Sequence, residues 1–228
     1  AGKAPAPPAA PAVKKDEAPP RPIDLSARSV EARVLRGETK NTLETVRCEG
    51  KVHVMQDPAN PDEKGVDITG TKLVMDYHEE GNSLVVTSDG QDPTTGGNDV
   101  AILQMDTMVI YGTDVHIDQA TNKAWVIGPG AMTMVSKTSF SGETLKEPVP
   151  LTVHWEQSML FNGNYAEFHS NIQAEQENAR LACDSLVVFF DRRISLKEGN
   201  KSAQPARVQH LLCDRSVRIE DSTYEGKE

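Results

Sequence analysis

Few side chains in this 228-residue sequence have the types and spacings that catalysis or metal binding requires. The three cysteines, Cys48, Cys183 and Cys213, lack the short spacing of a redox pair or a zinc knuckle. All three lie in strand-like runs, and free cysteine is among the most buried residue types. We therefore expect small core residues, at least one of them free or paired between molecules. A disulfide between Cys183 and Cys213 is the alternative if their strands stack side by side.

The histidines do not form a metal-binding pattern. His53, His116 and His154 alternate with apolar residues, and the sequence contains neither His-x-His nor His-Glu-x-x-His. We predict that they lie on the solvent-facing sides of strands.

The acidic residues and glycines suggest no active site either. The candidate carboxylate pairs Glu143 with Glu147 and Asp184 with Asp191 lie in turns or polar faces of an acid-rich chain. The segment 128–130, Gly-Pro-Gly, has no following Lys, Ser or helix that would make it a phosphate cradle, so it predicts a bend or bulge in a strand. We predict a non-enzymatic protein without catalytic residues, metal or cofactor.

The charge of the chain argues against two classes of partner. It has 24 Lys and Arg against 34 Asp and Glu, a net charge of −10. Nucleic acids and anionic membrane surfaces both require clustered positive charge. No run approaches the roughly 20 apolar residues of a membrane-spanning helix. The chain begins at Ala1 without a signal-peptide core, so we expect a mature or excised piece whose targeting signal has been lost.

The two ends and one internal segment differ in composition from the rest. Residues 1–22 are mostly Ala, Pro and Lys and predict a disordered, semi-rigid linker. The polar segment 191–205 predicts an exposed loop. Residues 23–228 would form one domain, which we expect to be truncated because the chain stops within a further strand pattern.

Alternation of apolar and polar residues is the main structural signal of this domain. It has the period of two that is typical of strands with one buried face, and no segment after Gly37 predicts a helix of credible length. In 23–36 a helix is the alternative, but Val30, Ala32 and Val34 favour a strand. The sequence thus predicts an all-β fold of about a dozen or more short antiparallel strands.

The central stretch 124–190 carries most of the aromatic residues of that pattern. Trp125, Trp155, Phe168 and Phe190 lie in its apolar runs. We predict that all four are largely buried.

One local pattern recurs along the chain. A small or turn-tolerant residue is followed by an apolar-x-apolar triplet, and in three cases a second strand follows, which is typical of stacked β layers. The four copies are 48–54, 128–134, 168–174 and 213–219.

This pattern resembles the repeat of the OstA-like family of periplasmic lipopolysaccharide-transport domains. The first match is residues 49–54 with 70–75, and the closer match is 168–174 with 182–188. In the closer match, Ser170 stands where the family usually has Gly. The resemblance covers roughly residues 44–220.

The resemblance implies a β-jelly-roll, or β-taco, in which two antiparallel sheets form a V. Its apolar groove would shield the acyl chains of lipopolysaccharide or another envelope glycolipid in the periplasm, and its edge strands would stack with other OstA-like domains. The lipid-binding side chains would be Val52, Val54, Leu73, Met75, Met132, Met134, Ile172 and Leu186. Met159 would share their face, and methionine suits irregular apolar shapes.

The same side chains could instead fill a closed core. The chain would then be a structural or protein-interaction scaffold whose terminal strands pair with neighbours by β-augmentation. An open inner groove would favour lipid binding, and a packed interior would favour the scaffold. A carbohydrate-processing β-solenoid is a third alternative, but the sequence lacks a carboxylate cluster on one face.

Overall fold

The protein was analysed as a computed structural model. The structure describes residues 22–58, 65–89, 100–105, 108–140, 143–196 and 208–221. The linker predicted for residues 1–22 lies almost wholly outside these residues. The described part of the chain contains no helix that is long and apolar enough to cross a membrane.

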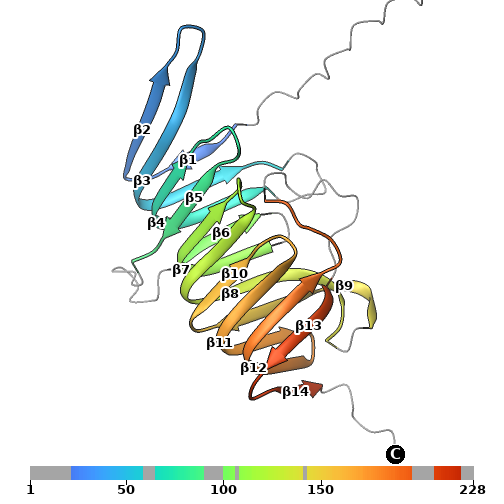
Figure 1. Cartoon of the computed structure of the whole chain (residues 1–228). Helices are drawn as coiled ribbons and strands as arrows, with labels where there is room; N and C mark the ends of the chain where they lie inside the picture. The colour runs from blue at the N-terminus through green and yellow to red at the C-terminus, as the bar shows by residue number, and fades with distance from the viewer. Residues whose placement is uncertain are drawn as a thin grey trace, which may run out of the picture.

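The described residues form an all-β fold, as the alternation predicted. Fourteen strands pair into one antiparallel sheet (Figure 1). In chain order they are β1 (Asp24–Ser26), β2 (Ser29–Arg36), β3 (Asn41–Gln56), β4 (Val66–Asp76), β5 (Ser83–Thr87), β6 (Ala101–Met105), β7 (Met108–Asp118), β8 (Lys123–Thr138), β9 (Thr144–Trp155), β10 (Ser158–Phe161), β11 (Tyr165–Gln176), β12 (Ala179–Phe190), β13 (Val208–Asp214) and β14 (Arg218–Asp221). The segment 23–36 is therefore strand and not helix.

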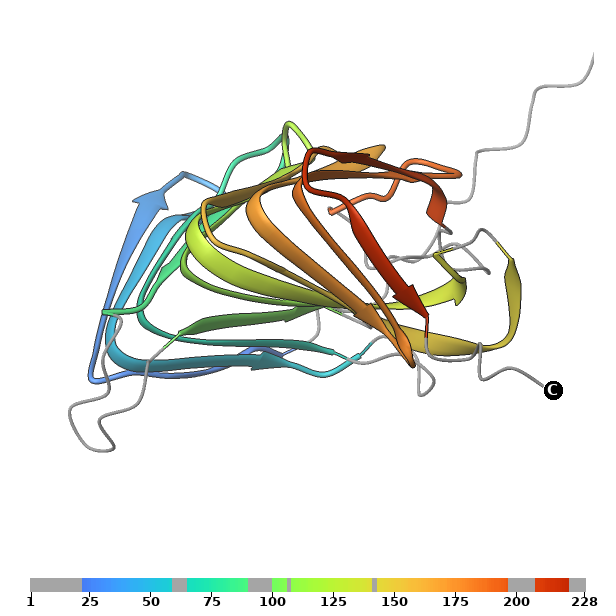
Figure 2. The same ribbon diagram turned by 90° about the horizontal axis from the view of Figure 1, so that it is seen from below.

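The sheet is folded along its middle into two arms. The long strands β3, β4, β7, β8, β11 and β12 each run through both arms, as the bent ribbons in Figure 2 show. In the first arm the pairing order is β2-β3-β4-β5-β7-β8-β10-β11-β12-β13. In the second arm it is β1-β3-β4-β6-β7-β8-β9-β11-β12-β14.

The corner between the arms coincides with the recurring sequence pattern. Gly50, Gly128, Ser170 and Arg215 all have positive φ angles, of 79°, 87°, 70° and 58°. Positive φ is easy for glycine and costs other residues energy, so these positions mark enforced bends. The register shifts beside Gly50 and Ser170 are β-bulges that turn the strand from one arm into the other. The serine that replaces glycine at position 170 thus still forms the bulge, and the bend expected at 128–130 is present.

The bulge changes which residues share a face. Phe168 and Ile172 are four residues apart in β11, whereas their partners in β12, Leu186 and Cys183, are only three apart, and all four are buried. The extra residue at each corner keeps the inner face apolar in both arms. The core therefore lies between the arms along the whole stack.

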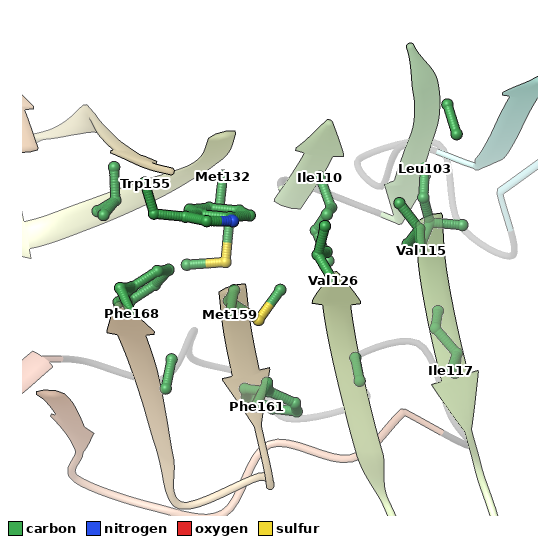
Figure 3. Packing of buried hydrophobic residues seen from close by; sticks show 14 of the residues in the cluster. Leu103, Ile110, Val115, Ile117, Val126, Met132, Trp155, Met159, Phe161 and Phe168 are labelled. Atoms are coloured by element: carbon green, nitrogen blue, oxygen red, sulfur yellow. The ribbon is translucent and has the colours of Figure 1, made fainter. Parts of the chain in front are cut away.

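Large side chains from both arms meet in the middle of this core (Figure 3). The Trp155 ring lies against Phe168 with ring centroids 5.4 Å apart, and its Nε1 donates a 3.1 Å hydrogen bond to the Gly128 carbonyl. Met132 and Met159 fill the space beside them, with 2% and 1% exposure. The middle of the interior is therefore filled by side chains.

Three of the four predicted core aromatics are confirmed, whereas Trp125 is only partly buried and lies outside the core. Trp155, Phe168 and Phe190 are buried. Trp125 pairs with His116 on the outer face of β7 and β8, and the two rings stack with centroids 4.8 Å apart. Because Ala124 and Val126 are the inward residues of this strand, Trp125 must point outward.

The same contact corrects the expectation for His116. His53 and His154 are exposed outer-face residues, as expected. His116 also lies on the outer face, but only 19% of its side chain is exposed, and its Nε2 atom lies 2.7 Å from Asp114 Oδ1. A neighbouring tryptophan can bury a histidine on the outside of a sheet.

The segment after β12 is not wholly an exposed loop. Leu196 is 6% exposed and belongs to the core. Buried Asn122 holds it there: its Nδ2 donates to the Ile194 carbonyl at 2.9 Å, and its Oδ1 accepts from the Leu196 amide at 2.8 Å. Residues 191–196, which we call the strap, are thus fixed to the β7–β8 turn.

Candidate functional site: the apolar interior and its two ends

The candidate site consists of the inner faces of both arms. Most of the predicted lipid-binding residues lie there and are buried. Val52, Val54, Leu73, Met132, Ile172 and Leu186 have exposures of 2%, 5%, 1%, 2%, 0% and 1%. The arrangement brings side chains from β3, β4, β8, β11 and β12 into one cluster.

Met75 and Met134 differ from the other predicted residues. Both are only partly buried and pack against the core cluster from its margins, as does Met108. Met108 lies two positions from Ile110 in β7, and Met134 lies two positions from Met132 in β8, so both methionines share the inner face of the Ile110–Met132 pair. Flexible methionines thus line the edge of the interior, where side chains can move most easily.

The interior is exposed at the N-terminal end of the stack. Leu25 of β1 lies opposite Val54, and Val30 of β2 lies opposite Cys48, so both face inward. They are nevertheless 38% and 51% exposed. No described strand covers their far side.

The C-terminal end shows the same feature. Ile219 of β14 lies opposite buried Leu181, on the inner face, and is 61% exposed. Leu211 of β13 lies opposite Val188 and is partly buried. The apolar interior therefore opens at both ends of the described stack.

Each end also presents strand edges. Within the described residues, β1 and β2 pair only with β3, and β13 and β14 pair only with β12. The β2–β3 hairpin extends further than β4, as Figure 1 shows at its blue end, because the Val34–Leu43 pair lies beyond the last β3–β4 pair at Thr45. Unpaired edge groups are a template for another strand.

No family model matches the chain, and no curated protein matches it either.

Acid–base groups do not gather in the interior. Among the described residues no group of three His, Cys, Asp or Glu side chains could hold a metal ion. His53 pairs with Asp67 on the outside, with Nε2 and Oδ1 3.0 Å apart. The Cys48 thiol is inside, and burial raises its pKa, which keeps it protonated at neutral pH. The described interior is therefore lined chiefly by apolar side chains.

Sequence reasoning missed the exposed inner residues of the terminal strands. Leu25, Val30 and Ile219 have the same alternating pattern as buried strands, so the pattern placed them on an inner face but could not show that they were uncovered. Their exposure could have been inferred from their position in the first and last strands of a stacked series, which have a neighbour on one side only.

Proposed function

We propose that this chain is a non-enzymatic module that stacks end to end with β domains of the same kind. The observation that carries the proposal is the pair of open ends: each combines unpaired strand edges with inward-facing apolar residues that remain exposed. Pairing of one domain's β13 and β14 edge with the next domain's β2 and β1 edge would bury these residues. It would also continue both arms, which is β-augmentation on two sheets at once.

Such a contact is heterologous, because two different surfaces meet. Heterologous contacts that do not close into a ring produce linear assemblies. Stacked copies would join their interiors into one apolar corridor, since the core cluster already runs from β3 to β12.

The experiment is a concentration series of the full chain in sedimentation velocity. Val30→Asp and Ile219→Asp place a charge on the inner face at either end, and each should weaken association by about 10-fold or more, because an unpaired charge would be buried. Ile127→Asp is the matched control: Ile127 is 55% exposed but points outward from the middle of the stack.

The control variant should associate like the unmodified chain. A chain that stays monomeric to millimolar concentration would contradict stacking between copies. Equal weakening by all three variants would show that association uses general surface hydrophobicity.

We propose a second function for the same interior: it would shield the acyl chains of a lipid in the bacterial envelope. It is supported by the methionines at the margins, Met75, Met108 and Met134, which can yield to an inserted chain. Apolar burial contributes roughly 25 cal/mol per Å², so several layers of contact could bind an acyl chain without charged groups. The packed centre requires that side chains move aside when lipid enters, because Met132 and Met159 already fill it.

The lipid proposal is tested with a small diazirine amino acid at Met132, Ile172 or the outer position His53. After illumination with purified lipopolysaccharide, adducts should form at the two inner positions and not at His53. Their yield should change little between low and high salt, because the contact is apolar. Equal labelling at all positions, or none, would leave the stacking scaffold as the function.

A further inference from the structure

Two cysteines of the C-terminal end lie on opposite sides of the corner. Cys183 is in the second-arm part of β12, opposite Ile172, and Cys213 is in β13 of the first arm, opposite Leu186. Ile172 and Leu186 are both fully buried inner residues, so both thiols point into the interior. The bend between them, where Ser185 pairs with Asp214, turns the two side chains toward each other.

The two thiol groups lie close to each other. The Cys183 thiol donates a hydrogen bond to the Ser185 carbonyl oxygen at 3.2 Å and is also within hydrogen-bonding reach of the Cys213 sulfur. Cys48 belongs to β3 at the other end of the stack, with 1% exposure. The chain therefore has one thiol pair and one distant thiol.

The members of the pair differ in access and acidity. Cys183 is 3% exposed, whereas Cys213 is only partly buried. Burial, followed by the proximity of Cys213, raises the pKa of Cys183 to about 12. Burial also raises the pKa of Cys213, but the hydrogen bond from Cys183 opposes that rise. Cys213 is thus the thiol that ionises and meets a reagent first.

We propose that Cys183 and Cys213 form a site of reversible oxidation, at which a small disulfide such as oxidised glutathione converts both thiols into an intramolecular disulfide. The inference does not depend on the proposed function.

The exchange balances in two steps. The Cys213 thiolate attacks one sulfur of oxidised glutathione, the glutathione S–S bond breaks, and one glutathione thiolate leaves and takes up a proton. Cys183 then loses its proton to solvent and attacks the Cys213 sulfur, which releases the second glutathione. Two protein thiols are oxidised, and one glutathione disulfide is reduced to two glutathione molecules.

The bond would anchor the terminal strand. β13 pairs only with β12 among the described residues, so one of its edges has no partner strand there. A covalent link between residues 183 and 213 reduces the freedom of the unfolded chain and should raise the thermal midpoint by roughly 5–10 °C.

The test equilibrates the full chain with glutathione buffers from fully reduced to fully oxidised, and then alkylates the remaining thiols. Two thiols should become inaccessible to alkylation together. Peptide mapping without reductant should recover the peptide of Cys183 linked to the peptide of Cys213. The initial rate should rise with pH above neutrality, because Cys213 must ionise.

Cys48→Ala is the matched control and should lose the same two thiols with the same rise in thermal midpoint. Cys213→Ala should form no intramolecular bond and show no rise, and Cys183→Ala should stop at a glutathione adduct on Cys213. A persistent glutathione adduct in the unmodified chain, a bridge that contains Cys48, or no loss of thiols in fully oxidised buffer would overturn the proposal.

Discussion

At the residue scale, Trp155 joins the two arms through contacts of different kinds. It packs on Phe168, its indole N–H bonds the Gly128 carbonyl, and a Cβ on Gly130 would lie 2.5 Å from its ring. The glycine is therefore required by close approach rather than by a positive φ. The Trp155 ring therefore leaves no room for a side chain at position 130.

Trp155→Ala should lower the free energy of unfolding by about 3–5 kcal/mol, because it leaves a large cavity in a packed core. Denaturant melts measure the loss. Trp155→Phe, which keeps most of the volume but loses the hydrogen bond to Gly128, should cost clearly less. A loss under about 1 kcal/mol for the alanine variant would mean that the ring does not support the core.

Asp118 stabilises the β7–β8 turn in its ionised form. Its Oδ1 accepts from the Ala120 amide at 2.9 Å, and its Oδ2 accepts from the Thr121 hydroxyl at 2.7 Å. The Thr121 hydroxyl is the main cause that lowers the pKa of Asp118 below its ordinary value of 3.8. A lowered pKa in the folded state means that the stabilisation is complete above the unfolded pKa and is lost as pH falls through the folded value.

Asp118→Asn should therefore destabilise the protein modestly at pH 7 and hardly at all at a pH below the lowered pKa of Asp118, where the native carboxyl is also protonated. Thermal melts at both pH values measure the difference. Asp89→Asn, at an exposed acid just after β5, controls for the removal of one charge. An equal change at both pH values would contradict a role for the ionised form.

At the element scale, the strap shows how a short polar segment is held against a β stack. The Asn122 side chain forms hydrogen bonds with the Ile194 carbonyl and the Leu196 amide. Gln119 Nε2 donates a further hydrogen bond to the Leu196 carbonyl at 3.1 Å. The Gly163 carbonyl accepts from the Ile194 amide at 2.8 Å. Buried backbone groups without such partners would cost free energy, so these bonds allow Leu196 to enter the core.

Asn122→Ala should free the strap, because it removes two hydrogen bonds worth roughly 1 kcal/mol each. Trypsin should then cleave after Arg192 and Arg193 several-fold faster, while the far-UV circular dichroism stays that of a β protein. Asn41→Ala, in the exposed β2–β3 hairpin, should leave cleavage at these sites unchanged. Unchanged cleavage in the Asn122 variant would show that the burial of Leu196 and the hydrogen bonds to Gln119 and Gly163 are enough to retain the strap.

At the scale of the whole molecule, the strands contact chiefly their neighbours in the pairing order, although β13 also contacts β8. Stability in such an arrangement is approximately a sum over layers and their interfaces, so layers with one neighbour open most easily. The large residues with the least exposure, such as Val126 and Phe168, belong to β8 and β11 in the interior of the series.

Hydrogen exchange should therefore be slowest in β8 and β11 and faster by 10-fold or more in β1, β2 and β14. Mass spectrometry of peptides from the intact chain measures the gradient. Raising the protein concentration should slow exchange in the end strands alone, because stacking would cover them. Uniform protection along the chain would contradict a layered stack with open ends.

The sequence by itself determined the strand character and the inward face of most strands. Alternation with period two needs only local information, because successive side chains of a strand point to opposite sides. It therefore placed Val52, Leu73 and Met132 inside and His53 outside. Of the corners it predicted the bend at 128–130, since the residues of a corner are adjacent in the chain.

Only the tertiary structure decided what covers each face. Trp125 alternates like a core residue but packs on His116 outside, and Leu196 lies in a polar segment but is buried. Ile219 has an inner-face position that nothing described covers, and Cys183 meets Cys213 across a corner. The physical reason is the same in each case: burial and contact depend on strands that are distant in sequence, whereas the alternating pattern records only the orientation of a residue within its own strand.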